Sequence, residues 1–584
     1  MRTYNIVVGL FALLGCGLTA CDDDESKKLR SDASAASGSS DAGAAISDTA
    51  PDQTTSIVDA NELIDAPGNM VDAPVIVQGP VPGDVFVSPT GLDTANNCSV
   101  ENMPCKTIVF AAGKAGAART IWLLDGAYGV TDQQFTYFGV KVGAGLTLRA
   151  RNNGSAVVRG LVEFAGDNRI VGVIFEQGVA DALTGGLRLL SGTNILEGID
   201  FRGNFAGPGS PLEVKGTAIV TLIPGDVAHF AASTVVHPSY NGYDPFIEVL
   251  DTATLTIAGG VLDGPGLGYS AQGHRLGYGA AIVVRGSAKL VLDGVTLKVN
   301  TNGIGVRNNA TVSVLNSTIS AVKLEGGAFG IFVSTDPGET AVVNVKGSTI
   351  SGFASGGSSA AVGLVADVPY VTHAKVSLTD STLQGSSLGI YVNGYNDSSF
   401  TLVGTSLKDN MFGGAQISGA CAFDMKGGSV TGNAGFSLNT VWSYHGGLWF
   451  GNGAQKYAVK LRGVTISNNR NAVNNGNTGA LSNSGLTLGG SAASTFDLGT
   501  SADTGGNTIT GHNTSAATSN ISVATTGVVV SAVGNTFDPN IQGAGPAGLF
   551  QLGAAPCAAN TCDITSGTGA NYSVASGTLR LAAP

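Results

Sequence analysis

Two arginines, Arg285 and Arg307, occupy equivalent places in consecutive repeats and are the residues best placed for chemistry. The repeats are Ile247–Leu262, Ile282–Leu297 and Ile304–Ile319, which align without a gap. Side chains alternate across a strand, so both arginines point outward if the neighbouring Ile and Val residues point inward. Consecutive strands lie about 4.8 Å apart, and like charges stacked at that distance need an acid or a bound anion to neutralise them.

Acidic residues lie close to these arginines in the repeat pattern. Glu248 occupies the same outer face one repeat earlier. Asp251 and Asp263 are nearby, and His274 and Arg275 follow them. The default interpretation is a local cluster of salt bridges. One alternative is a patch that binds a sulfated or uronate sugar. The other is a lyase centre, in which carboxylates hold Ca²⁺ and a basic residue abstracts the proton α to a uronate carboxylate.

A group of aromatic side chains is the second candidate binding feature. They fall in one inserted stretch and comprise Trp442, Tyr444, His445, Trp449 and Phe450. Exposed rings could stack on sugars, whereas a loop packed over the fold would bury them, and we take the packed loop as the default. The six histidines are scattered and none is at metal-ligand spacing, so no metal site is predicted.

The repeats that carry these residues have the pattern of stacked β-strands. Each contains an apolar alternating run, a polar break, a second apolar run, then Gly or Asn before a last short run. Successive copies are offset by 35 and 22 residues, which is typical of a solenoid with insertions. Similar last-strand runs recur from residue 170 to 537, so we expect an all-β solenoid of about 12–14 rungs.

Asparagines and several long intervals lie between the predicted strands. Asn tolerates left-handed backbone and stacks in hydrogen-bonded ladders, so we expect structural roles for those that follow strands. These asparagines are Asn410, Asn433, Asn468, Asn469 and Asn513. Loops that project from one edge, where repeat proteins place binding surfaces, are predicted in three intervals. The intervals are Gly207–Asp244, Gly264–Gly279 and Asn433–Ala454.

The N-terminal residues have the features of an export signal and a tether. Residues 1–20 read as a signal peptide with an apolar core too short to span a bilayer comfortably. Leu18-Thr19-Ala20-Cys21 resembles the bacterial lipobox, which implies cleavage before Cys21 and lipid on its thiol. Residues 22–80 carry 12 acidic and 3 basic residues, so residues 21–80 are predicted to be a disordered acidic tether. The remaining chain is close to neutral, which argues against a nucleic-acid partner.

Cysteine spacing supports export. Cys98 with Cys105 and Cys557 with Cys562 form two short-range pairs near the two ends of the body. In a secreted chain such pairs favour disulfides over free thiols. Cys421 lies in an apolar run and is predicted to be a buried thiol.

The start of the body resembles a known group of proteins. It contains V-S-P-T-G at 87–91, P-C-K-T-I at 104–108 before an Ala-rich run, and L-D-G-A-Y at 124–128. This arrangement resembles the leading segment of bacterial surface proteins built on a right-handed, single-stranded parallel β-helix, the pectate-lyase-like superfamily. The resemblance implies an N-terminal cap and first rung at 81–130, with strands at 85–88 and 120–124 and a capping helix over about 107–118. A parallel β-helix would follow at 131–545 and a C-terminal cap at 546–584.

The superfamily includes enzymes, and their signatures are incomplete in this sequence. Gly260–Gly266 resembles the G-x-I-D-G-x-G element of polygalacturonase-like hydrolases. Asn300–Ile304 resembles their N-T-D-G-I element, but Asn302 replaces the catalytic Asp, and hydrolysis needs two carboxylates. We therefore expect a lipid-anchored protein of the outer membrane or cell surface that binds polysaccharide or another surface component. The alternative is a lyase or hydrolase acting on an acidic polysaccharide. No cofactor is expected, except Ca²⁺ under the lyase alternative.

Overall fold

The structure is a computed structural model of the 584-residue chain. It describes residues 79–116, 119–129, 140–176, 186–202, 210–224, 228–229, 245–263, 280–299, 302–322, 328–353, 362–366, 373–392, 398–435, 446–451, 455–471, 483–512, 519–537, 551–552, 555–556, 563–564, 567–568 and 572–580. The chain divides into two units, Met1–Gly79 and Pro80–Pro584, and every described helix and strand belongs to the second. The predicted signal peptide, Cys21 and almost all of the tether lie outside the described residues.

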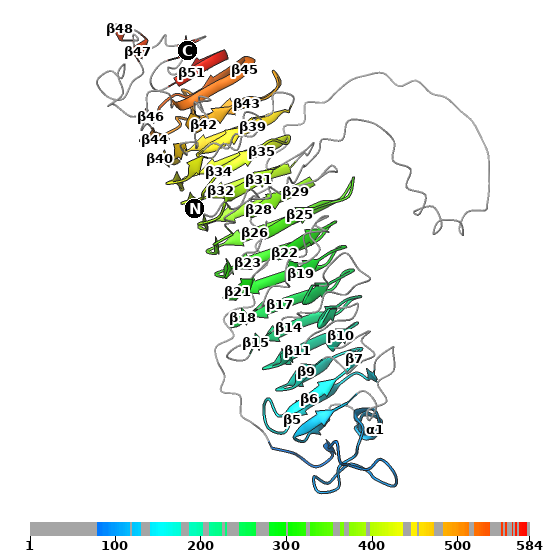
Figure 1. The fold of residues 1–584 in the computed structure, drawn as a ribbon. Helices are drawn as coiled ribbons and strands as arrows, with labels where there is room; N and C mark the ends of the chain where they lie inside the picture. The colour runs from blue at the N-terminus through cyan, green and yellow to red at the C-terminus, as the bar shows by residue number, and fades with distance from the viewer. Residues whose placement is uncertain are drawn as a thin grey trace, which may run out of the picture. The chain divides into compact units, whose positions relative to one another are not determined.

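The second unit is a stack of rungs, each built from up to three strands that pair in parallel with the rungs before and after (Figure 1). The first strands of successive rungs are β4 (Val140–Val142), β7 (Leu161–Phe164), β10 (Gly186–Leu189), β13 (Leu212–Val214), β16 (Ile247–Val249), β19 (Ala280–Val284), β22 (Asn302–Arg307), β25 (Phe329–Ser334), β28 (Val362–Ala366), β31 (Leu388–Val392), β34 (Gly413–Ile417), β38 (Leu448–Phe450) and β42 (Asn483–Leu488). We call this set the first-strand series.

The second-strand series begins two strands earlier, in the cap. Its members are β1 (Val85–Val87), β2 (Thr120–Leu123), β5 (Leu146–Ala150), β8 (Asn168–Val171), β11 (Thr193–Glu197), β14 (Ile219–Ile223), β17 (Thr254–Ala258), β20 (Lys289–Asp293), β23 (Thr311–Leu315), β26 (Thr340–Lys346), β29 (His373–Thr379), β32 (Ser398–Val403), β35 (Cys421–Lys426), β39 (Tyr457–Arg462) and β43 (Thr495–Asp497). The long strands β45 (Ser519–Ser531) and β51 (Tyr572–Arg580) continue both series.

The third-strand series forms two shorter parallel sheets. The first sheet holds β3 (Gly126–Tyr128), β6 (Ala156–Arg159), β9 (Ile174–Glu176) and β12 (Asp200–Arg202). The second holds β15 (Ala228–His229), β18 (Val261–Asp263), β21 (Thr296–Val299), β24 (Thr318–Ala321), β27 (Thr349–Ser351), β30 (Thr382–Gln384), β33 (Ser406–Lys408), β36 (Ser429–Thr431), β40 (Thr465–Ser467), β44 (Thr508–Thr510) and β46 (Thr536–Phe537). A small parallel pair joins β37 (Ala434–Gly435) to β41 (Arg470–Asn471).

The register predicted from the three aligned repeats is confirmed. Ile247 pairs with Ile282, and Ile282 pairs with Ile304. All three side chains are buried, as period-2 alternation requires. The corners between strands use residues that accept positive φ, such as Asp251, Gly286 and Asn308 after the first strands. The shared corner chemistry fixes where each strand starts, so the repeats stay in register despite insertions of different length.

Asparagines form the predicted ladder inside the stack. The Nδ2 atom of Asn410 donates to Oδ1 of Asn433 at 2.8 Å, and Asn433 donates likewise to Asn469 at 2.9 Å. The ladder ends at His512, whose Nδ1 accepts the backbone N–H of Asn469 at 3.3 Å. All four residues are buried, so the ladder satisfies polar groups that have no access to water. Asn468 has the other predicted role, because it adopts a left-handed backbone conformation, with φ of 55°, at a corner between strands. Asn513 lies outside the described residues.

A column of glycines runs beside this ladder. Gly303, Gly330, Gly363, Gly389 and Gly414 occupy equivalent places on consecutive rungs. A Cβ at Gly330 would overlap the backbone oxygen of Gly363 and approach core side chains. The glycines therefore let the rungs approach one another at this corner and leave interior space for larger neighbours.

The N-terminal cap has the predicted elements with shorter bounds. The helix α1 spans Ile108–Lys114 rather than 107–118. Thr107 is its N-cap, with Oγ1 accepting the Phe110 N–H at 3.2 Å, and the helix ends because Ala115 is extended. Cys98 and Cys105 form the predicted disulfide. The helix buries Ile108 and Ala111, and no helix among the described residues is long and apolar enough to cross a membrane.

Two of the intervals predicted as loops contain strands, so those predictions are wrong. Gly207–Asp244 includes β13, β14 and β15, and Asn433–Ala454 includes β38. Strands of this length have three inward side chains or fewer, so their apolar runs are short. Such short runs cannot be distinguished in the sequence from the turn residues around them. Gly264–Gly279 lies outside the described residues.

Antiparallel pairing appears at the C-terminal end. The strands β49 (Asp563–Ile564) and β50 (Gly567–Thr568) pair antiparallel with β51, and β47 (Gln551–Leu552) pairs antiparallel with β48 (Ala555–Pro556). Cys557 and Cys562 lie outside the described residues. Cys421 is buried without a disulfide, as predicted.

Candidate functional site

The outward positions of the first-strand series form one column in continuous register, which we call the outer strip. From the N-terminal end its residues are Lys141, Glu163, Arg188, Glu213, Glu248, Val283, Gly305, Phe332, Val365, Tyr391, Gln416, Trp449 and Thr487. The first five are charged, and most of the later ones are apolar, aromatic or amide residues. The two halves are therefore suited to different interactions.

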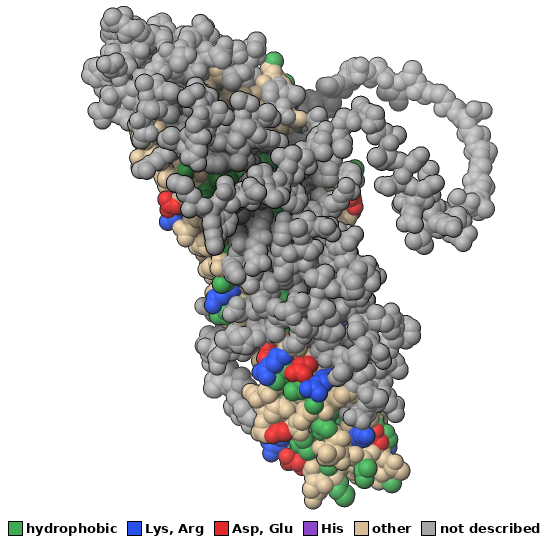
Figure 2. Space-filling model, in the orientation of Figure 1, with side chains coloured by type: hydrophobic (Ala, Val, Ile, Leu, Met, Phe, Trp, Pro, Cys, Tyr) green, Lys and Arg blue, Asp and Glu red, His purple; other side chains and the backbone are tan. Residues whose placement is uncertain are grey.

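Ion pairs fill the charged half of the outer strip. Arg188 lies between two carboxylates, with Nε 2.7 Å from Oε2 of Glu213 and Nη1 3.4 Å from Oε2 of Glu163. Lys215, two residues after Glu213 on the same face, places Nζ 3.0 Å from Oε1 of Glu213. The side chains of Glu163 and Glu213 are 9% and 11% exposed, so these pairs are largely withdrawn from water. In Figure 2 basic and acidic side chains lie next to one another on the rungs near α1.

The predicted pair of arginines joins this network at its C-terminal side. Val284 pairs with Val306, so Arg285 and Arg307, the residues that follow, are neighbours in register. The Nη2 atom of Arg285 lies 3.2 Å from Oε1 of Glu248. The salt-bridge interpretation therefore holds for Glu248 and Arg285, where the carboxylate lies against the guanidinium of Arg285.

The other residues named with these arginines have different places. Asp251 is a corner residue with φ of 61°, and its Oδ2 accepts the Gly216 N–H at 2.9 Å. Asp263 ends β18, in the third-strand series, and pairs in register with Lys298. Neither residue belongs to the first-strand series that forms the outer strip. His274, Arg275 and Trp442 lie outside the described residues.

Asn302 has a structural contact at the place where polygalacturonase-like hydrolases carry a catalytic Asp. It opens β22, and its Oδ1 accepts the Phe329 N–H from the next rung at 2.9 Å. A buried backbone donor is thereby satisfied. This hydrogen bond between rungs explains why an amide occupies the position.

The aromatic half of the outer strip centres on Gln416, which lies between Tyr391 and Trp449 on adjacent rungs. Trp449 belongs to β38 and not to a loop, so the prediction that it lies in an inserted stretch is wrong. Its ring lies across Gly451, where any Cβ would overlap it. Phe450, predicted in the same stretch, is in the core.

Gln416 has an unsatisfied polar atom. The residue is 7% exposed, and its Oε1 has no hydrogen-bond partner among the described residues. A buried acceptor left without a donor costs about 1–3 kcal/mol. An unpaired carbonyl oxygen between two partly exposed rings is suited to accept a hydroxyl group while the rings contact the apolar face of a sugar.

Sequence reasoning missed most of this site. Glu163, Arg188 and Glu213 occupy the place of Glu248 in earlier rungs, and L-E-V at 212–214 matches I-E-V at 247–249. Extending the repeat alignment toward the N-terminus would have found them. No comparable signal existed for Gln416, because the strand that contains it, Gly413–Ile417, consists mostly of small residues. Within the described residues no group of three or more His, Cys, Asp and Glu side chains could hold a metal ion.

The stacked parallel strands, the capping helix and the turn chemistry define the class of fold. It is a right-handed, single-stranded parallel β-helix. No family model matches the sequence, and no curated protein matches it.

Several solved structures are similar to the chain. One is PfbA, a surface adhesin of Streptococcus pneumoniae, with 11% identity, a TM-score of 0.35, and coverage of 54% of this chain and 82% of the adhesin. Another is a PL6 alginate lyase in complex with a trisaccharide, with 12% identity, a TM-score of 0.29, and coverage of 59% and 86%. A rhamnogalacturonan lyase has 11% identity, a TM-score of 0.25, and coverage of 67% and 83%. At these values the likeness concerns the fold alone and decides nothing about function.

Proposed function

We propose that this chain is an exported, lipid-anchored cell-surface protein that binds a polysaccharide on the aromatic half of its outer strip and does not cleave it. The observation that carries the proposal is the unpaired Oε1 of buried Gln416 between Tyr391 and Trp449. Tyr391 and Trp449 are two rungs apart, about 10 Å, which suits contact with every second sugar of an extended chain.

The charged half of the outer strip favours binding over cleavage. A general acid or base must be able to exchange a proton with the substrate. Glu163, Glu213 and Glu248 each lie within 3.4 Å of a basic side chain. These carboxylates are therefore engaged in ion pairs, and Asn302 cannot replace them because an amide is neither acid nor base.

The lipid anchor is proposed from the sequence. Leu18-Thr19-Ala20-Cys21 and the acidic residues after it match a lipobox followed by a solvated tether. Radiolabelled palmitate fed to cells that express the full chain should label it, and Cys21→Ser should abolish the label. Equal labelling of both chains would contradict the anchor.

Affinity electrophoresis of the full chain in gels that contain xylan, a neutral polysaccharide, or polygalacturonate tests the binding site. Trp449→Ala, Tyr391→Ala and Gln416→Leu should each weaken retardation by at least one of these polymers. Truncating a central aromatic costs about 2 kcal/mol, which corresponds to roughly 30-fold in affinity. Thr94→Ala, at an exposed position in the N-terminal cap, is the matched control and should bind as the unmodified chain does. Retention of full binding by all three variants would contradict the proposal.

The lyase alternative is tested in the same preparation. The full chain is incubated with polygalacturonate and Ca²⁺ while the absorbance of unsaturated uronate is followed. Product that disappears in the Arg285→Ala/Arg307→Ala variant would make the protein a lyase and overturn a purely binding role. We expect no rise in absorbance.

A further inference from the structure

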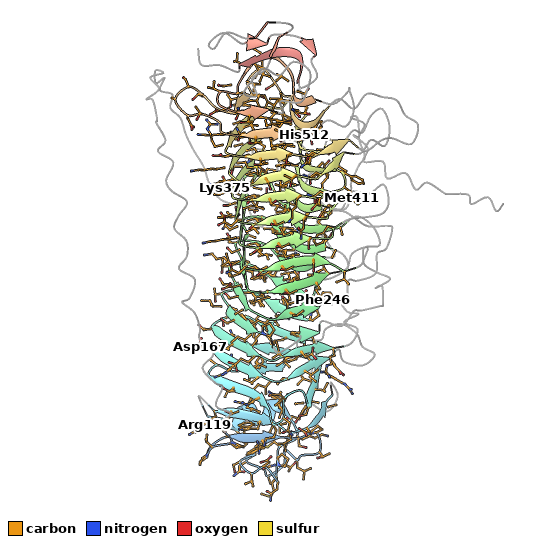
Figure 3. The ribbon with its side chains drawn as sticks, turned by 90° about the vertical axis from the view of Figure 1, so that its left-hand side faces the viewer. Arg119, Asp167, Phe246, Lys375, Met411 and His512 are labelled. Carbon is orange, nitrogen blue, oxygen red and sulfur yellow. A yellow bond between two sulfur atoms is a disulfide. The ribbon has the colours of Figure 1, made fainter. Side chains whose placement is uncertain are left out.

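Four exposed lysines lie on the outward face of the second-strand series, on a different strand of each rung from the outer strip. They are Lys289 on β20, Lys346 on β26, Lys375 on β29 and Lys426 on β35. We call this surface the lysine face. The strands β20, β23, β26, β29, β32 and β35 are consecutive neighbours, so the four lysines extend over five rung spacings, about 24 Å. Figure 3 shows Lys375 and Met411 on opposite sides of the stacked strands.

None of the four lysines forms an ion pair with another described residue. In contrast, Lys460 on the next rung is 3.2 Å from Oδ2 of Asp503. The alternation of buried and exposed residues along β29 and β35 shows why the lysines are accessible, because each follows an inward core side chain. In register, Lys289 aligns with Lys375 and Lys346 aligns with Lys426, so the ammonium groups form two short columns near opposite ends of these strands. Both columns run along the stack and place positive charge on the same face.

The rest of the lysine face mixes small polar residues with the aliphatic side chains of Val291, Leu315, Val342 and Val403. Between the lysines lie Thr311, Ser313, Asn344, Ser377, Ser399 and Thr401. Asp293 and Asp424 are the acidic residues on the same strands, and Asp293 accepts from Asn316 at 3.4 Å. Hydroxyl and amide groups between cations provide hydrogen bonds for a ligand that has both anionic groups and hydroxyls.

We propose that the lysine face binds an anionic linear polysaccharide, a polymer of uronate or sulfated sugars, laid along the solenoid axis. Charge complementarity selects an anion, and the rung spacing of about 4.8 Å is close to the length of one sugar in an extended chain. Single-stranded nucleic acid is disfavoured because its binding uses aromatic side chains for base stacking. The outward residues on the described parts of β20 to β35 in this series include no Phe, Tyr or Trp.

Binding at the lysine face does not depend on the outer strip, and the two sites can be tested separately. Binding of the full chain to polygalacturonate and to heparin is measured by calorimetry at two salt concentrations. Lys346→Gln/Lys375→Gln should weaken binding about three- to tenfold, since each exposed charge contact contributes only modestly to affinity. The same variant should show a weaker dependence on salt. Asp424→Asn should strengthen binding, because it removes a negative charge from the face.

The control is Lys106→Gln/Lys114→Gln, which removes two lysines from the N-terminal cap. Equal losses in the two double variants, or no loss in the face variant, would overturn the proposal. A single-stranded DNA bound as tightly as polygalacturonate and lost with Lys346→Gln/Lys375→Gln would also overturn it in favour of nucleic acid. Xylan binding that is lost in Trp449→Ala and kept in the face variant would show that the outer strip acts separately. Failure of the outer strip alone would leave the polygalacturonate result of the face variant unchanged.

Discussion

The Nε atom of Arg188 donates to Oε2 of Glu213 at 2.7 Å, across the boundary between two rungs. On its other side the same guanidinium reaches Glu163 at 3.4 Å. One side chain thus ties three consecutive first strands, β7, β10 and β13, through charge as well as through backbone pairing. The contact forms because Glu163, Arg188 and Glu213 are in register on their three strands and their side chains all point outward.

Replacing Arg188 should destabilise these rungs. Arg188→Met leaves Glu163 and Glu213 largely buried with less positive charge near them, although Glu213 keeps Lys215. We expect a loss of about 2–4 kcal/mol in the free energy of unfolding, as for other broken buried pairs. Guanidinium titration of the full chain measures it. Arg285→Met, whose side chain is 47% exposed, should have a much smaller effect, and equal effects would contradict the explanation.

The asparagine ladder gives a matched pair of neighbouring residues. Asn433→Ala removes the acceptor for the Asn410 N–H and the donors to Leu407 and Asn469, and should cost about 2–4 kcal/mol. Asn468→Gly changes only an exposed corner with φ of 55°, where Gly is at least as well suited, and should be within about 0.5 kcal/mol of the unmodified chain. Thermal unfolding compares the two. A larger loss from Asn468→Gly would contradict the assigned roles.

Two glycines should respond in opposite directions to the same substitution. Gly330→Ala places a methyl group against the Gly363 carbonyl and core side chains, so it should destabilise by several kcal/mol, about 3 or more. Gly113→Ala lies within α1, where nothing is within 4 Å of the new methyl group, and should stabilise by up to about 1 kcal/mol. Unfolding midpoints of the two variants test this. A stable Gly330→Ala chain would mean that the rungs have room to separate.

Gln416 should show opposite effects on stability and on binding. Gln416→Met keeps the length of the side chain but removes the buried amide oxygen that has no partner, so unfolding should become less favourable by about 1–2 kcal/mol. Polysaccharide retardation should fall in the same variant, because the acceptor for a sugar hydroxyl is lost. Destabilisation with unchanged binding would indicate that the amide has only a structural role.

Asp503 should contribute stability that depends on pH. Its hydrogen bonds from Arg462 at 2.9 Å and Lys460 at 3.2 Å hold the pKa of this carboxyl below its ordinary value. A lowered folded-state pKa stabilises the fold above the unfolded pKa, and that contribution disappears as pH falls through the lower value. Asp503→Asn should therefore be less stable than the unmodified chain at pH 7, and the difference should begin to shrink near about pH 4 and disappear once the pH is below the lowered pKa of Asp503. A difference that is the same at pH 3 and pH 7 would contradict the assignment.

The sequence predicted the stacking of rungs because two independent patterns agreed. Inward Ile and Val residues such as Ile282 and Ile304 set the face of each strand, and corner residues such as Gly286 and Asn308 set its ends. The cap disulfide and the capping helix followed from local spacing and local motifs. Features encoded within one rung, or between aligned copies, were therefore accessible to sequence reasoning.

Features that join rungs separated by insertions of different length were not accessible. Tyr391, Gln416 and Trp449 become neighbours only through the register of β31, β34 and β38, and no shared motif marks these positions. Trp449 also lay in a stretch rich in aromatic and glycine residues, where a three-residue strand cannot be separated from a loop. The binding site depended on pairing geometry that the residue types alone do not specify.

The junctions Gly303–Ile304 and Gly330–Ile331 are equivalent, so the length of the β-helix can change by whole turns. Ile304 pairs with Ile331, so the segment 304–330 is one complete turn of the coil that begins and ends at matching junctions. Its excision would join Gly303 to Ile331 and recreate the original junction, with β19 facing β25. The rod would shorten by about 4.8 Å and keep both ends intact. Duplication of the same turn would lengthen the β-helix by the same amount, so its length can change in steps of one turn.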